Sequence, residues 1–166
     1  KIDDDIFPSY ETKWTSIYQG NKSSDIYYYT KDNIAEIAIN VSEDRLIFYK
    51  PPRKDLNFPL ETGKDWDVIT YRYIKEGDNE SEVQKELKFH YVCEEKTQID
   101  TPAGNFEAYK INRTLENEKG NNYELFFYSP RVKNFIKYEF HTPTSASKEQ
   151  FLVSYDLQEG DDNPSN

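Results

Sequence analysis

Apolar and polar residues alternate along much of this chain. In three stretches every second residue is apolar, and the residues between them are mostly charged or polar. The apolar sets are Ala35, Ile37, Ile39 and Val41, then Leu87, Phe89, Tyr91 and Cys93, then Phe151, Val153, Tyr155 and Leu157. A period of two places side chains on one face of a β-strand. We therefore predict half-buried strands over 33–41, 83–93 and 151–157, with Glu36 on a polar face.

Turn residues separate these alternating stretches. Gly20-Asn21, 76–79 and 118–122 contain the Gly, Asn and Asp combinations that are typical of hairpin tips. No segment keeps an apolar stripe at helical spacing over three turns, although single helical turns fit within 6–18 and 144–150. The pattern predicts an all-β fold, either a single antiparallel barrel or a strongly curled sheet of about ten strands.

Each of the two tryptophans follows a Phe-Pro pair and a short polar turn. The phrases are FPSYETKW over 7–14 and FPLETGKDW over 58–66. Such a phrase is typical of a chain that turns and enters a sheet with a large aromatic anchor. We predict that Trp66 is buried at the start of a central strand. The prolines before it indicate a connector over 50–60, and an internal duplication is left open.

Composition limits the domain organisation and the partners. A chain of 166 residues suits one domain over 1–166, with acidic, frayed tails at 2–5 and 159–164. A formal net charge of -10 argues against nucleic acid and anionic membranes as partners, because both attract clustered Lys and Arg.

The sequence also bears on location. No apolar run reaches the ~18 residues of a membrane span. Because the chain starts at Lys1 and has no Met, we expect a mature, exported product, and a lipid anchor upstream of Lys1 is an open alternative.

The residues that carry most metal and nucleophile chemistry are few. The only histidines are His90 and His141, and the only cysteine is Cys93. Both histidines are expected at the surface, and Cys93 is expected as a buried, unreactive thiol because it alternates in register with apolar residues. No phosphate-binding glycine loop or EF-hand spacing occurs. The sequence therefore predicts no catalytic residue, no metal site and no cofactor, and we expect the protein not to be an enzyme.

Aromatic residues are the remaining candidates for a binding role. The chain has 14 Tyr, 10 Phe and 2 Trp. Aromatic strand residues mostly form core, but a barrel interior lined by Tyr and Phe suits a small ligand. The candidate ligand-binding residues are Tyr71, Tyr73, Phe89, Tyr91, Tyr109, Phe127 and Tyr138.

Four motifs together indicate a family. They are FPLETGKDW over 58–66, TPAGNFEAYKI over 101–111, FYSPRV over 127–132 and IKYE over 136–139. Their order and spacing resemble a bacterial family of exported β-rich proteins and lipoproteins, which is classed as a domain of unknown function. The chain departs from that family at Lys133-Asn134, where a Gly-containing turn is common. The resemblance implies an antiparallel sheet curled into an open or closed barrel and a periplasmic or cell-envelope location. It supplies no catalytic residues.

Two functions follow as expectations. The first is a non-enzymatic cell-envelope module that binds or assembles with another envelope protein, because no reactive cluster is visible. The alternative is a carrier or binding protein for an apolar small molecule or lipid in a β-barrel cavity. An apolar cavity of roughly several hundred Å³ would favour the carrier, a filled interior would favour the assembly module, and a carboxylate-lined cleft would reopen hydrolysis.

Overall fold

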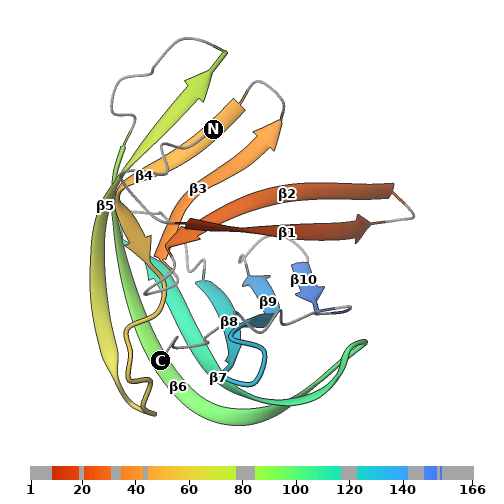
Figure 1. The fold of residues 1–166 in the computed structure, drawn as a ribbon. Helices are drawn as coiled ribbons and strands as arrows, with labels where there is room; N and C mark the ends of the chain where they lie inside the picture. The colour runs from red at the N-terminus through yellow and green to blue at the C-terminus, as the bar shows by residue number, and fades with distance from the viewer. Residues whose placement is uncertain are drawn as a thin grey trace, which may run out of the picture.

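The computed structural model describes residues 9–18, 21–30, 35–42, 45–77, 85–116, 123–141, 148–152 and 154. These residues form one antiparallel sheet of ten strands, in which each strand pairs with its neighbours in the chain (Figure 1). The strands are β1 (Ser9–Tyr18), β2 (Asn21–Thr30), β3 (Ala35–Ser42), β4 (Arg45–Lys54), β5 (Asp65–Glu76), β6 (Lys85–Thr101), β7 (Gly104–Leu115), β8 (Tyr123–Ser129), β9 (Asn134–His141) and β10 (Lys148–Phe151). The described part of the chain contains no helix. The predicted all-β antiparallel fold is confirmed.

The sheet is strongly curled, so that one of its faces is concave. Figure 1 shows the long strands β5, β6 and β7 bending around one side of the molecule, while β9 and β10 lie inside the curve. Among the described residues, no ladder joins the outer strands β1 and β10. The curled sheet is therefore what the structure shows.

The main core lies on the concave face of β4 to β9. Leu87, Phe89, Tyr91 and Cys93 are all buried there, as their alternation in the sequence predicts. Burial also raises the pKa of the Cys93 thiol, which disfavours the reactive thiolate. The polar face of the same strand carries His90, whose Nδ1 lies 2.7 Å from Asp67 Oδ1. The predicted register of β6 and the buried position of Cys93 are confirmed.

A second apolar cluster covers the opposite face of β8. Its buried members are Phe106, Ala108, Leu125, Phe127, Val132 and Ile136. Residues 125 to 129 of β8 are all buried, so this strand has apolar contacts on both of its faces. The long β6–β7 hairpin contributes Phe106 and Ala108 to this cluster. Apolar side chains therefore pack on both faces of the sheet at β8.

Two turns between strands contain a residue with a positive φ. In the turn between β6 and β7, Ala103 N donates to Thr101 Oγ1 over 3.1 Å, and Gly104 takes a φ of 130°. Strand β8 ends at Ser129 and is followed by a turn in which Lys133 has a φ of 56°. A non-glycine residue rarely adopts this left-handed conformation.

The predicted connector over 50–60 is partly wrong, because β4 continues through its two prolines to Lys54. The pairing of β3 with β4 jumps from Glu36↔Arg53 to Ala38↔Phe48, which leaves Pro51 and Pro52 outside that ladder. Proline has no backbone N–H, so it is tolerated where a strand is not required to donate. The loop between β4 and β5 starts only at residue 55.

The predicted polar position of Glu36 is also wrong. The irregular pairing of β3 with β4 between Glu36 and Ala38 breaks the period of two, because a bulge shifts every following side chain to the other face. As a result Glu36 is only 2% exposed.

The C-terminal strand is shorter than predicted. Strand β10 ends at Phe151, and the described residues Leu152 and Ser154 are not in a strand. The predictions for Val153, 155–157, the hairpin tip at 118–122 and both acidic tails lie outside the described residues.

Candidate functional site

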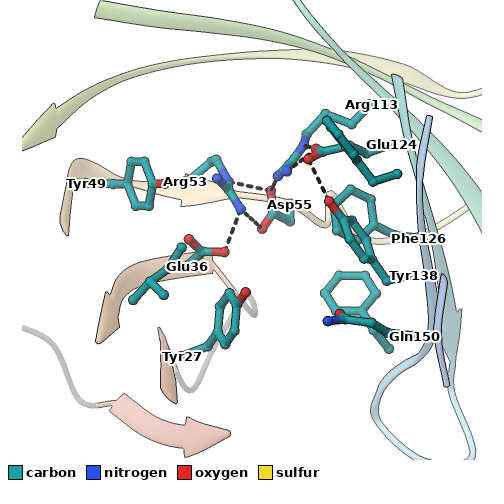
Figure 2. Close-up of a pocket in the computed structure, with 13 residues that line it drawn as sticks. Tyr27, Glu36, Tyr49, Arg53, Asp55, Arg113, Glu124, Phe126, Tyr138 and Gln150 are labelled. Atoms are coloured by element: carbon teal, nitrogen blue, oxygen red, sulfur yellow. Dashed lines mark hydrogen bonds and ion pairs between the residues drawn. The ribbon is translucent and has the colours of Figure 1, made fainter. Parts of the chain in front are cut away.

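A cavity of about 470 Å³ lies on the concave face of the sheet. Residues from strands near both ends of the sheet line it, which agrees with the strong curl. The lining residues are Tyr27, Glu36, Ile39, Tyr49, Arg53, Asp55, Arg113, Glu124, Phe126, Phe135, Tyr138, Phe140 and Gln150. Figure 2 shows Glu36 and Tyr27 on one side of this space, with Phe126, Tyr138 and Gln150 on the other.

Five charged side chains in the cavity wall form a chain of ion pairs in which the sign of charge alternates. Arg53 Nη2 donates to Glu36 Oε2 over 2.5 Å, and Arg53 Nε donates to Asp55 Oδ1 over 2.9 Å. Arg113 Nη1 donates to the same Asp55 oxygen over 3.1 Å. Arg113 also pairs with Glu124 through Nε and Nη2. The order is therefore Glu36, Arg53, Asp55, Arg113, Glu124, with a carboxylate at each end (Figure 2).

Strand register explains how this chain of ion pairs forms. Glu36 on β3 is directly opposite Arg53 on β4, and Arg113 on β7 is directly opposite Glu124 on β8. Opposite charges at directly paired positions attract across a sheet. Asp55 follows β4 immediately and joins the two cross-strand pairs. Two hairpins that are distant in the sequence thus share one polar cluster.

Aromatic rings hold both guanidinium groups in place. Arg53 Cζ lies 4.9 Å from the centre of the Tyr49 ring, and Arg113 Cζ lies 4.6 Å from the centre of the Phe126 ring. The ring of Phe89 contacts both arginines, with its centre 5.4 Å from Arg53 Cζ and 5.1 Å from Arg113 Cζ. Such contacts favour a cation over the face of a ring.

Two tyrosine hydroxyls donate to two of the three carboxylates. Tyr91 donates to Asp55 Oδ1 over 2.6 Å, and Tyr138 donates to Glu124 Oε1 over 2.8 Å. Among the described residues, Glu36 Oε1 has no hydrogen-bond partner although it is buried. Glu36 is therefore the incompletely satisfied end of the chain of ion pairs.

Burial affects the pKa values of Glu36 and Asp55 differently. Burial raises the pKa of Glu36 from 4.5 to about 7, with Arg53 opposing this shift and Asp55 adding to it. Burial would also raise the pKa of Asp55, but Arg53 and Arg113 together hold it below its ordinary value. Burial disfavours the charged form of an acid and a nearby cation favours it. Asp55 with two arginines stays ionised, whereas Glu36 titrates near neutral pH.

The Glu36 shift predicts how stability depends on pH. Because its pKa is raised in the folded state, its stabilising contribution is complete below pH 4.5 and is lost as the pH rises through 7. At most roughly 3 kcal/mol of unfolding free energy should disappear over this interval. Urea denaturation of the parent and of Glu36→Gln from pH 4.5 to 8 measures this loss. Parallel pH profiles of the two proteins would contradict the assignment.

The seven aromatic residues that the sequence predicts as ligand-binding candidates lie in different parts of the structure. Only Tyr138 lines the cavity. Phe89 and Tyr91 lie behind the wall and contact the charged cluster, and Tyr109 packs against the main core. The other three do not contribute to the site. Tyr71 and Tyr73 lie on the face of β5 opposite to the buried residues Trp66 and Val68. Phe127 belongs to the second apolar cluster.

Sequence reasoning missed all five charged residues. A signal existed for two of them, because Arg113 alternates in register with buried Ile111, and Glu124 with buried Phe126. A charged residue at a core position of a strand is informative because it requires a partner in the interior. For Glu36 the bulge removed the signal, and for Asp55 there was no periodic pattern to follow.

The remaining chemical groups lie in ordinary contacts. His141 Nε2 is 2.8 Å from Glu139 Oε2, and the His141 ring stacks on Tyr123. Within the described ranges no three His, Cys, Asp or Glu side chains are grouped so that they could hold a metal ion. No described helix has the length and apolar character to cross a membrane.

Comparison with known proteins gives no assignment. No protein-family model matches the chain, and neither the curated proteins nor the solved structures contain a significant match. Function must therefore be argued from the cavity and its charged cluster.

Proposed function

We propose that this protein binds a small amphipathic molecule in the cavity on the concave face of its sheet. The observation that carries the proposal is a cavity of about 470 Å³ whose wall combines aromatic rings with a preformed chain of ion pairs. Ligand pockets in proteins commonly measure roughly 300–1,000 Å³ and are apolar, with a few polar groups that fix orientation. The cavity has both properties.

The charged cluster supports a ligand with one polar end. Arg53, Asp55 and Arg113 bind one another, so they are fixed before any ligand arrives. A rigid polar group lowers the cost of binding because little ordering is needed. The apolar body of the ligand would lie against Ile39 and the aromatic rings. This modifies the carrier expected from the sequence, whose ligand was purely apolar.

The geometry favours binding over hydrolysis. Two-carboxylate catalysis needs one acid that is protonated and one carboxylate that is available to act as base or nucleophile. Glu36 meets the first requirement through its raised pKa. Asp55 and Glu124 accept hydrogen bonds from both an arginine and a tyrosine, which lowers their reactivity. The non-enzymatic role stays our proposal.

The other expectations from the sequence remain proposals beside this one. Closure of the curled sheet into a barrel would enclose the cavity further, and a periplasmic or cell-envelope location would suit a carrier. Membership of the resembled family and assembly with another envelope protein stay predictions. None of these is needed for the binding proposal.

An uncharged fluorescent probe tests the proposal. N-Phenyl-1-naphthylamine should bind saturably, with one probe per chain and an increase in fluorescence. Replacing Ile39 in the cavity wall by Trp should fill part of the cavity and weaken binding by about tenfold.

The matched control is Ile69→Trp on β5. Ile69 is 52% exposed, on the opposite face of the strand from buried Val68 and Thr70. This variant should bind the probe as the parent does. If the parent shows no saturable binding, or if the two Trp variants are affected equally, the cavity is not the binding site.

A further inference from the structure

The charged wall of the cavity is unbalanced. The carboxylates are those of Glu36, Asp55 and Glu124, and the guanidinium groups are those of Arg53 and Arg113. When all are ionised, three negative and two positive charges leave an excess of one negative charge on the wall. Because both ends of the alternating chain are carboxylates, the excess lies at Glu36 and Glu124. These ends come from opposite parts of the curled sheet, β3 and β8.

The end at Glu36 is also incomplete in its hydrogen bonding. Its Oε2 accepts from Arg53, whereas its Oε1 is buried and has no partner in the described part of the chain. A buried acceptor without a donor costs free energy that a suitable ligand can recover. The terminal torsion of a glutamate side chain is soft, so the carboxylate can turn either oxygen toward a ligand.

We infer that the ligand of this cavity carries a protonated amine, which binds at the Glu36 end of the charged wall while its apolar body lies among the aromatic rings. The inference rests on the binding role proposed above and names the chemical class of the ligand. An ammonium group would supply both the missing positive charge and an N–H donor for Glu36. The ring faces of the wall would favour it further, since aromatic rings attract cations.

A carboxylate ligand fits the same wall poorly. Arg53 and Arg113 would be its natural partners, but both already donate to carboxylates of the protein. A further anion would have to displace one of these or remain beside the existing excess of negative charge. Buried charges without partners are strongly unfavourable. The wall therefore discriminates between cationic and anionic ligands of similar shape.

The experiment compares three probes that share one apolar body. Calorimetric titration at pH 8 would use 3-phenylpropylamine, 3-phenyl-1-propanol and 3-phenylpropanoate. We expect the amine to bind about tenfold more tightly than the alcohol, and the carboxylate to bind more weakly than either. Glu36→Gln should remove the preference for the amine and leave alcohol binding nearly unchanged. The control Glu61→Gln, at an exposed position in the β4–β5 loop, should behave as the parent.

A pH series on the parent protein keeps the inference testable if Glu36→Gln does not fold. The charged groups that act on Glu36 are Arg53, Asp55, Arg113 and Glu124. Burial raises the pKa of Glu36 to about 7, whereas Arg53 and Arg113 hold the pKa of Asp55 below its ordinary value despite burial. A primary alkylamine keeps its proton from pH 6 to 8. Its affinity should rise by about tenfold over this range as Glu36 ionises, whereas the affinity of the alcohol should stay constant.

The outcomes separate this inference from the proposed function. Equal binding of amine and alcohol, or tighter binding of the carboxylate, would overturn the amine inference and leave the binding role intact. Binding of the naphthylamine probe without any binding of 3-phenylpropylamine would do the same. If neither that probe nor any of the three phenylpropyl compounds binds, the proposed function fails as well.

Discussion

Replacing Arg53 by Met should lower the free energy of unfolding by about 3–5 kcal/mol at pH 8. Arg53 is buried and pairs with both Glu36 and Asp55. The substitution preserves much of the apolar volume but leaves buried Glu36 without its arginine partner and buried Asp55 with Arg113 alone. Removing one partner of a buried ion pair is costly because the remaining charge stays out of water. Chemical denaturation followed by far-UV circular dichroism measures the loss.

The loss should be smaller at pH 5, because Glu36 can then take up a proton instead of remaining an unpaired anion. The matched control is Arg45→Met on the same strand. Arg45 is exposed and pairs with exposed Glu76 at 3.5 Å, so its loss should cost less than about 1 kcal/mol. If both variants were equally stable, Arg53 would not be holding the two buried carboxylates.

Replacing Trp66 by Ala should lower the unfolding free energy by about 3–5 kcal/mol. Trp66 is 8% exposed at the start of β5, as its sequence context predicts. Its ring stacks on Tyr91 with a centroid distance of 5.2 Å, and its Nε1 donates to Lys54 O over 3.3 Å. The substitution would leave a large cavity beside the residue that hydrogen-bonds Asp55.

The comparison variant for Trp66 is Ile69→Ala on the same strand. Because Ile69 is largely exposed, truncating it should change stability by less than about 0.5 kcal/mol. Guanidinium denaturation midpoints of both variants and the parent provide the measurement. A Trp66→Ala midpoint within error of the parent would show that the indole does not anchor β5.

The sequence predicted regular strands well because alternation is a local property. The register of β6 followed directly from Leu87, Phe89, Tyr91 and Cys93, all of which are buried. Trp66 could be placed for the same reason, since the turn before it and the strand after it are both encoded locally. Neither inference required knowledge of which strands are neighbours.

The candidate site could not be predicted in this way. Glu36 is buried because of a bulge in its pairing with a strand that contains two prolines, and alternation fails at bulges. Asp55 is in a loop, and its role depends on Arg113, which only the curl of the sheet brings near. Arg113 and Glu124 alternate in register with apolar neighbours, so they are the two site residues that the sequence pattern could have indicated. Their significance depends on a partner that the local pattern does not reveal.

The position of Asp55 has a consequence for how the sheet opens. Its carboxylate joins Arg53, two residues away, to Arg113, 58 residues away. Separating the β3–β4 hairpin from the β7–β8 hairpin would expose charges on both sides at once, which penalises any partly opened state. Local openings in proteins tend to follow cooperative units of this kind. The two hairpins should therefore protect their amide hydrogens from exchange as one unit, despite their separation along the chain.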